Sequence, residues 1–129
     1  MAKLTEPCPC GSNKNYTECC AHFLASNEIA PNAEALMRSR YTAYTLLEED
    51  YLLVTWHSST RPASLGLSKE VPAKWLGLDV KRHELQDNEH AIVEFVARYK
   101  VNGRAQRLHE VSNFVREEGR WFYVDGQVD

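Results

Sequence analysis

Residues 91–116 read AIVEFVARYKVNGRAQRLHEVSNFVR. Over Ala91–Val101 apolar side chains recur at every second position, which is the period of a half-buried strand. The pair Asn102-Gly103 follows, and this pair favours the tight two-residue turn of a β-hairpin. Alternation resumes over Gln106–Arg116. The stretch therefore predicts two adjacent antiparallel strands, and these strands decide the fold class.

Further strands are expected on both sides of this hairpin. Glu117–Arg120 contains Gly119 and predicts a second turn, which leads into a strand over Arg120–Asp125. Before the hairpin, Leu78–Leu85 is expected to be a strand, and Ser68–Leu76 a short helix with Trp75 as its apolar anchor. The second half of the chain is thus predicted to be mainly an antiparallel meander.

The first half has a helical period instead. Asn32 is a good N-cap, and apolar or aromatic residues recur at helical spacing from Leu36 to Leu47. A second, shorter helix is expected over Tyr51–His57, and its side chains are apolar nearly all round, which is typical of a helix buried on most sides. Helices followed by a curved antiparallel sheet predict an α+β domain in which the helices cover one face.

Composition narrows the classes of function. The chain has 129 residues, of which 43% are hydrophobic, and this is enough for one domain with its own core. A net charge of −3 argues against a protein that binds nucleic acid by bulk electrostatics. There is no apolar run long enough for a membrane span. Without an export signal, the protein is expected to be cytoplasmic.

All four cysteines lie in the segment CPCGSNKNYTECC, residues 8–20. Their spacing allows Cys8, Cys10, Cys19 and Cys20 to bind one structural zinc ion tetrahedrally, with Gly11 at the sharp turn after the first pair. The alternatives are two disulfides, inert buried thiols or an iron–sulfur cluster. Disulfides are typical of small secreted chains, an adjacent pair bridges to itself only with strain, and the CxxC spacing of many iron–sulfur sites is missing.

Two family resemblances follow from these motifs. The cysteine segment resembles the SEC-C motif, CxCGSGxxxxxCC, with Asn13 in place of the second glycine. The segments AEALMRSRYTAY, YLLVTWHSSTRP, LHEVSNF and GRWFYVDG resemble the YchJ family of uncharacterised bacterial proteins. The resemblance implies a SEC-C zinc knuckle over residues 1–25 and a nuclear transport factor two-like cone over residues 30–129.

The favoured hypothesis for function is a protein-interaction or adaptor module. Zinc held by four cysteines has no open coordination position, so its role would be structural. In the translocation ATPase SecA the similar motif contacts the chaperone SecB, so the resemblance implies a protein partner. The exposed recognition residues would then be Lys14, Asn15 and Tyr16. No nucleic-acid partner is expected, because the segment has too few cations.

The alternative is a small-molecule site in the cone, with acid or base catalysis of the isomerase or dehydratase type. The leading pocket candidates are Glu110, His57, Tyr44 and Arg38; further candidates are Arg40, Tyr41, Trp56 and His109. Because His109 and Glu110 are neighbours on a strand, their side chains point to opposite faces. Glu110 shares its face with Leu108 and Phe114 and is expected inside. A structural ion pair between Glu110 and Arg38 or Arg40 is favoured over catalysis, so the sequence leans towards a protein that is not an enzyme.

Overall fold

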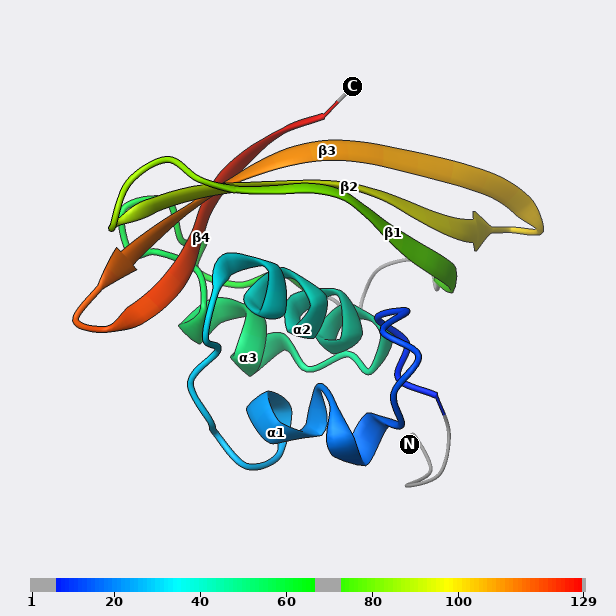
Figure 1. Ribbon diagram of the computed structural model, residues 1–129. Helices are drawn as coiled ribbons and strands as arrows, with labels where there is room; N and C mark the ends of the chain where they lie inside the picture. The colour runs from blue at the N-terminus through cyan, green and yellow to red at the C-terminus, as the bar shows by residue number, and fades with distance from the viewer. Residues whose placement is uncertain (1–6, 67–72, 129) are drawn as a thin grey trace.

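The computed structural model describes residues 7–66 and 73–128. Figure 1 shows an antiparallel sheet on one side and short helices on the other, with one helix directly under the sheet. The elements are η1 (Tyr16–Glu18), α1 (Ala21–Leu24), α2 (Ala33–Thr45), α3 (Glu49–Val54), β1 (Ala73–Leu85), β2 (His90–Val101), β3 (Arg104–Glu117) and β4 (Arg120–Val128). The strands follow the order β1-β2-β3-β4. The predicted α+β class, with helices packed on a curved antiparallel sheet, is confirmed.

The hairpin predicted from Asn102-Gly103 joins β2 to β3. Both turn residues have positive φ, 52° and 78°, as the favoured two-residue turn requires. The resulting register pairs Phe95 with Glu110 and Ala97 with Leu108. Glu110 therefore projects from the same face of the sheet as the apolar side chains of β2.

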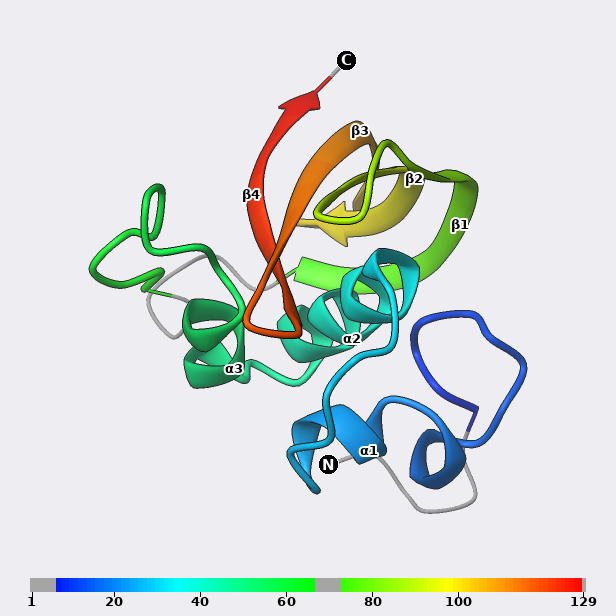
Figure 2. The same ribbon diagram turned by 60° about the vertical axis from the view of Figure 1, so that its left-hand side comes forward.

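The sheet curves around α2. Register shifts interrupt β1 between Trp75 and Gly77 and between Val80 and Arg82, and β3 and β4 have a further shift at Asn113/Phe114. Irregularities of this kind bend a strand and increase its twist. Figure 2 shows the strands arching over α2, so the concave face of the sheet and this helix enclose the core.

Helix α2 begins as the sequence predicts. The Asn32 side chain accepts a hydrogen bond from the backbone N–H of Ala35 at 2.8 Å, which satisfies a donor of the first turn. The buried residues Leu36, Met37 and Tyr41 of α2 belong to one apolar cluster with side chains from the strands. The helix thus packs along the concave face of the sheet.

The helix predicted over Ser68–Leu76 is wrong where the structure describes it. Residues 73–76 belong to strand β1, and residues 67–72 lie outside the described part of the chain. Trp75 pairs with Tyr99 of β2, with ring centroids 5.1 Å apart. Cross-strand aromatic contacts of this kind stabilise a sheet and outweigh a weak local helix preference.

The second predicted helix is shorter and less buried than expected. α3 ends at Val54, which is 61% exposed, and Leu52 is its fully buried residue. Beyond the helix, the His57 backbone N–H donates to the carbonyl of Tyr123 at 2.7 Å, and Trp56 forms a bridge to the same residue. The chain leaves the helix because hydrogen bonding to the edge of β4 satisfies its backbone there.

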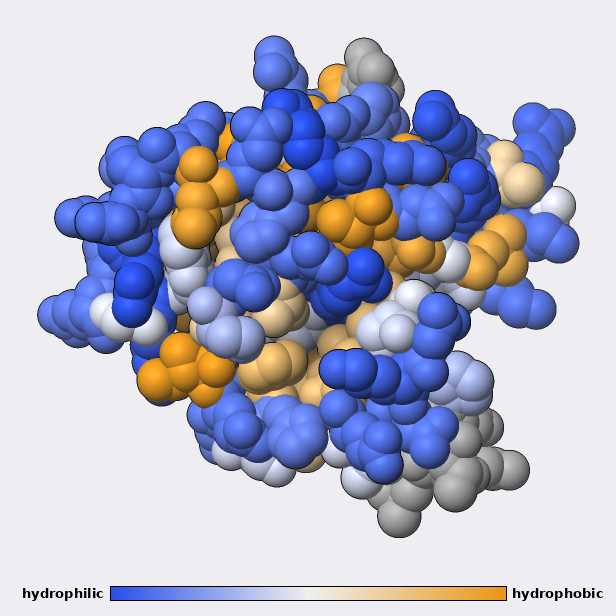
Figure 3. All heavy atoms as spheres, viewed as in Figure 1, coloured by the Kyte–Doolittle hydropathy of each residue, from blue (hydrophilic) through white to orange (hydrophobic). Residues whose placement is uncertain are grey.

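Charged side chains cover the outer face of the sheet. Glu94 lies 2.7 Å from His109 and 3.2 Å from Arg82, and Val96 is buried beside them. Figure 3 shows polar side chains over most of the visible surface, with smaller apolar areas between them. His109 therefore lies outside the cone, as its alternation with Glu110 predicts. Within residues 7–66 and 73–128, no helix is long and apolar enough to cross a membrane.

Candidate functional site

The four cysteines come together at one end of α2. Their sulfur atoms all lie within 4.8 Å of one another, and none forms a disulfide. The Sγ atoms of Cys10 and Cys19 are 3.6 Å apart, and those of Cys19 and Cys20 are 4.0 Å apart. Four sulfurs bound tetrahedrally at about 2.3 Å would be separated by roughly 3.8 Å. The cluster therefore has the size needed to hold a metal ion.

Local hydrogen bonds bring the two cysteine pairs together. The backbone N–H of Cys8 donates to the carbonyl of Lys14 at 2.8 Å, which closes the loop between the pairs. Gly11 and Asn13 both have positive φ, 79° and 69°. A Cβ atom at Gly11 would lie 3.0 Å from the carbonyl oxygen of Leu78, so glycine also lets the knuckle contact β1 directly.

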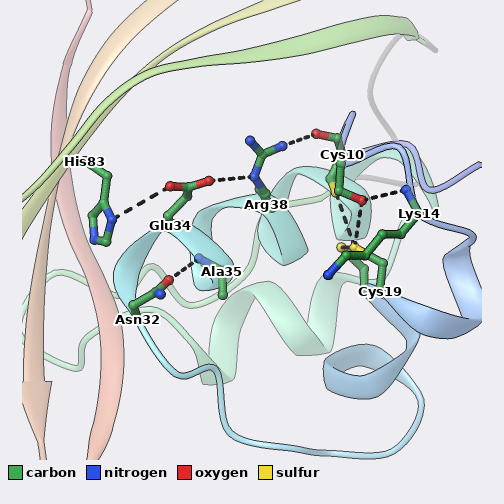
Figure 4. Close-up of polar contacts among 10 residues, drawn as sticks. Cys10, Lys14, Cys19, Asn32, Glu34, Ala35, Arg38 and His83 are labelled. Carbon is green, nitrogen blue, oxygen red and sulfur yellow. Dashed lines mark hydrogen bonds and ion pairs between the residues drawn. The ribbon is translucent and has the colours of Figure 1, made fainter.

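Helix α2 donates hydrogen bonds to the cysteine segment. The Thr42 hydroxyl donates to Cys20 Sγ at 3.3 Å, and Arg38 Nη1 donates to the carbonyl of Cys10 at 2.7 Å. The Nε atom of Arg38 donates in turn to the carboxylate of Glu34 at 3.0 Å (Figure 4). Arg38 was a pocket candidate, but it contacts the knuckle and Glu34 and does not line the cavity described below. These polar groups hold the cysteine segment in place.

The sulfur atoms are too close to remain independent thiols. Hydrogen bonds from the thiols of Cys10 and Cys20 lower the pKa of Cys8 far below its ordinary value. Contacts of Cys20 with the sulfurs of Cys10 and then Cys8, together with burial, raise the pKa of Cys20 far above the ordinary value. Buried sulfurs at this spacing share protons unless a cation replaces them, and thiolate is the form that binds metal.

The loop between the cysteine pairs is only partly available to a partner. Lys14 and Asn15 are exposed, as expected for recognition residues. Tyr16, the third such residue, is half-buried and packs against the apolar cluster that includes the cysteines. Its ring therefore contributes to attaching the knuckle to the cone.

A second feature lies between α2 and the concave face of the sheet. It is a cavity of about 420 Å³. Its lining is mostly aromatic and apolar, with a few polar groups, which is the usual character of a small-molecule site. The lining residues are Met37, Arg40, Tyr41, Tyr44, Trp56, Trp75, Phe95, Ala97, Tyr99, Val101, Leu108, Glu110, Ser112, Phe114 and Tyr123.

Glu110 is the acidic group of this cavity. Its Oε2 accepts a hydrogen bond from the Ser112 hydroxyl at 2.6 Å and a longer one from the Tyr123 hydroxyl at 3.4 Å. Burial and the charge of Glu110 raise the pKa of Tyr123, so this phenol stays protonated and donates. The expected ion pair with Arg38 or Arg40 is not formed: within the described ranges, no arginine lies within ion-pair distance of Glu110.

Arg40 is the basic group of the cavity. Its side chain is 6% exposed, and its Nη1 donates to the carbonyl of Leu52 at 2.8 Å and to Thr55 Oγ1 at 2.7 Å. Its guanidinium carbon lies 4.6 Å from the ring centre of Tyr123 and 5.2 Å from that of Trp56. Burial lowers the pKa of Arg40, although an arginine still remains charged near neutrality.

Two of the four leading pocket candidates, Glu110 and Tyr44, line the cavity, and the other two do not. His57 lies outside it, where Nε2 is 2.7 Å from Glu117 and Nδ1 is 2.7 Å from the Ser59 hydroxyl. The helix that would have placed His57 at its end stops at Val54. Arg38 points to the knuckle, as described above.

Sequence reasoning missed Ser112 and Tyr123 as partners of Glu110. Ser112 is two residues from Glu110 on the same strand, so strand alternation predicts that both side chains lie on the same face of the sheet. Tyr123 reaches the carboxylate from β4, and its place depends on the register shift at Asn113/Phe114, which no pattern within one strand predicts.

Comparisons with known proteins agree with this architecture. Residues 32–126 match the model of the YchJ middle NTF2-like domain, and residues 5–21 match that of the SEC-C motif. A UPF0225 protein of Polaromonas naphthalenivorans is 53% identical, and the match covers 95% of this chain and 98% of the relative. Another, from Ralstonia nicotianae, is 54% identical, and the match covers 96% of this chain and 92% of the relative.

Two solved structures are similar along almost the whole chain. A SEC-C motif containing protein from Rhodopseudomonas palustris has a TM-score of 0.86 at 34% identity and covers 96% of this chain and 99% of its own. A SEC-C motif containing protein from Psychrobacter arcticus has a TM-score of 0.77 at 29% identity, with coverage of 98% and 84%. The chain therefore belongs to the YchJ family of UPF0225 proteins, with a SEC-C motif ahead of an NTF2-like domain.

Proposed function

We propose that this protein binds a small, largely apolar molecule in the cavity of its cone, and that a zinc ion held by Cys8, Cys10, Cys19 and Cys20 has a structural role. The observation that carries the proposal is the cavity itself, which contains Glu110 and Arg40 without an ion pair between them. A filled cone with these two groups bonded to each other would have favoured a purely structural interior.

The cavity resembles a ligand site more than a packing defect. At about 420 Å³ it falls within the range of small-molecule pockets, and it could hold roughly fourteen waters at about 30 Å³ each. Its charged groups and the hydroxyls bonded to Glu110 come from three elements: Arg40 on α2, Glu110 and Ser112 on β3, and Tyr123 on β4. Such an arrangement orients a ligand while aromatic walls provide the burial.

A neutral fluorescent probe tests binding. N-phenyl-1-naphthylamine should become brighter when it enters the cavity of the purified protein. Ala97→Phe places a ring inside the cavity and should weaken binding at least about tenfold, since overlap with a bound molecule must be relieved. Ala105→Phe, at an exposed position of β3, is the matched control and should leave binding unchanged.

Two results would contradict the cavity proposal. One is the absence of any saturable fluorescence increase with the wild-type protein. The other is equal binding by wild type and Ala97→Phe, because the probe would then lie elsewhere on the surface. Near-ultraviolet circular dichroism of both variants should match that of the wild type, which confirms that the aromatic core is intact.

The zinc proposal rests on the donor set. Four sulfurs close the coordination sphere of zinc, so the metal would stabilise the loop without activating water. Elemental analysis of protein purified without a metal-chelating tag should find about one zinc per chain, as this tetrahedral site requires. Cys19→Ser should lower the zinc content. A ratio near zero, together with oxidised cysteines, would disprove the site.

A partner at the knuckle is a second proposal, favoured by one observation. A groove of about 770 Å³ runs beside Cys19 and is lined by Lys14, His22, Glu28 and Arg38 among others. The SEC-C resemblance suggests a protein there. An affinity pull-down should compare wild type with a Cys8→Ser, Cys10→Ser form and with Lys14→Glu, which leaves the cysteines in place. A partner kept by Lys14→Glu but lost with the cysteines would depend on the fold of the knuckle and not on the groove.

A further inference from the structure

We propose that the ligand of the cavity is a small aromatic or apolar anion whose acidic group binds the guanidinium of Arg40. This inference rests on the proposed cavity function and adds the charge and the orientation of the ligand. It depends on the burial of Arg40, on the contacts that Arg40 makes, and on the position of Glu110.

Arg40 is a buried cation that has no acidic partner in the described part of the chain. Its side chain is 6% exposed, and no carboxylate within the described ranges lies within ion-pair distance of it. Buried charges in proteins are normally paired, because removing a charge from water is costly. An arginine that lines a cavity and lacks such a pair is a site for an anion.

The existing contacts of Arg40 compensate its charge only in part. Two hydrogen bonds, to Leu52 and Thr55 at the end of α3, both come from Nη1. The carboxyl-terminal end of a helix attracts a cation with a partial charge only. The rings of Trp56 and Tyr123 add cation–π contacts at 5.2 and 4.6 Å. These contacts fix the guanidinium in place. Among the described residues no hydrogen bond occupies its Nε or Nη2, so these donors are available to a ligand.

Glu110 is held away from this arginine. Its carboxylate lies against Gly126, where a Cβ atom would come within 2.0 Å of Oε2, and it accepts from Ser112 and Tyr123. Tyr123 stands between the two charges, with its ring near Arg40 and its hydroxyl near Glu110. The cavity therefore has a basic end and an acidic end, separated by one tyrosine.

This polarity sets the orientation of a ligand. An acidic group would bind at Arg40, and the body of the ligand would lie against aromatic walls such as Trp75 and Tyr99, whose rings are 5.1 Å apart. A hydroxyl or N–H group at the far end could donate to Glu110. A ligand with two acidic ends is disfavoured, because the second would face Glu110.

A matched pair of dyes tests the inference on the full chain. 1-Anilinonaphthalene-8-sulfonate and N-phenyl-1-naphthylamine share one skeleton and differ by a sulfonate. Arg40→Met should weaken binding of the sulfonate roughly ten- to a hundredfold, as expected for a lost hydrogen bond to a charged group, and should change binding of the neutral dye by less than about twofold. Arg98→Met, which removes an exposed arginine paired with Asp79, is the control and should affect neither dye.

Glu110→Gln provides an independent readout that keeps Arg40 intact. It removes a negative charge from the cavity and should strengthen binding of the sulfonate relative to the neutral dye. The inference is therefore tested even if Arg40→Met does not fold.

The outcomes separate this inference from the cavity proposal. The inference that the ligand is an anion is wrong if the neutral dye binds and the sulfonate is excluded, or if neither substitution changes the ratio of the two affinities. The proposed cavity function stands in both cases. If neither dye binds, both proposals fail.

Discussion

Gly126 leaves the space that the carboxylate of Glu110 occupies. A Cβ atom there would lie 2.0 Å from Glu110 Oε2, so Gly126→Ala must displace the carboxylate from Ser112 and Tyr123. The expected loss in the free energy of unfolding is about 1.5–3 kcal/mol, which is the usual range for a lost hydrogen bond to a charged group. Urea unfolding of the wild type and the variant measures this loss.

Gly77→Ala is the matched control, because Gly77 also lies in a strand but a Cβ atom there would have no other atom within 4 Å. It should change stability by less than about 0.5 kcal/mol. The cost of Gly126→Ala should also shrink in a Glu110→Ala background, where no carboxylate has to move. An equal cost in both backgrounds would assign the effect to the backbone of β4.

The face of Glu110 was predictable from the sequence, but its partners were not. Strand alternation depends on the backbone alone, so the inward position of Glu110 follows from Leu108 and Phe114. Arg38 and Arg40 are two residues apart on a helix and so point in directions about 200° apart. Only one can face the sheet, and the contacts of α2 with the knuckle decide that Arg40 does.

Helix α2 connects the two candidate sites. Arg38 and Thr42, four residues apart, contact the cysteine segment, whereas Arg40, Tyr41 and Tyr44 line the cavity. Helical geometry places residues four apart on one face, which accounts for the separation into a knuckle face and a cavity face. Helix α2 therefore contributes residues to both the knuckle and the cavity, although the two sites have different chemistry.

Thr42→Val tests the knuckle face of this helix. The substitution preserves shape but removes the hydroxyl that donates to Cys20 Sγ. Loss of a group that supports a metal ligand typically costs about 10–100-fold in metal affinity, and competition with a chromophoric chelator measures it. Thr45→Val is the control, because the Thr45 hydroxyl donates to the carbonyl of Thr42 and not to a cysteine. Equal affinities of Thr42→Val and wild type would mean that the hydroxyl does not support the metal.

At the level of elements, prediction succeeded where one local signal sufficed. The Asn102-Gly103 turn specifies its own hairpin, and the Asn32 cap specifies the start of α2. It failed for Trp75 and for the end of α3, because both depend on residues distant in the sequence, Tyr99 and Tyr123. Cross-strand pairing and edge hydrogen bonds are tertiary effects that a local period does not contain.

At the scale of the whole molecule, the cysteine cluster and the cone share one core. Cys8, Cys10 and Cys20 belong to the same buried cluster as Leu36, Tyr41 and the inward side chains of the sheet. The sheet nevertheless has its own hydrogen bonds across four strands. A bound metal is therefore expected to secure the segment around the cysteines without being needed for the strands.

Acidification in the presence of a chelator separates these two parts. Thiolates bind the metal and protons compete for them, so as pH falls below the ordinary thiol pKa of about 8.5, apparent metal affinity falls and its stabilisation is lost. Hydrogen exchange should then show loss of protection at the N–H groups of Cys8 and Cys19, which close the knuckle. The amides that pair β2 with β3 should stay protected. Simultaneous loss of protection in these strands would instead mean that the metal holds the entire fold together.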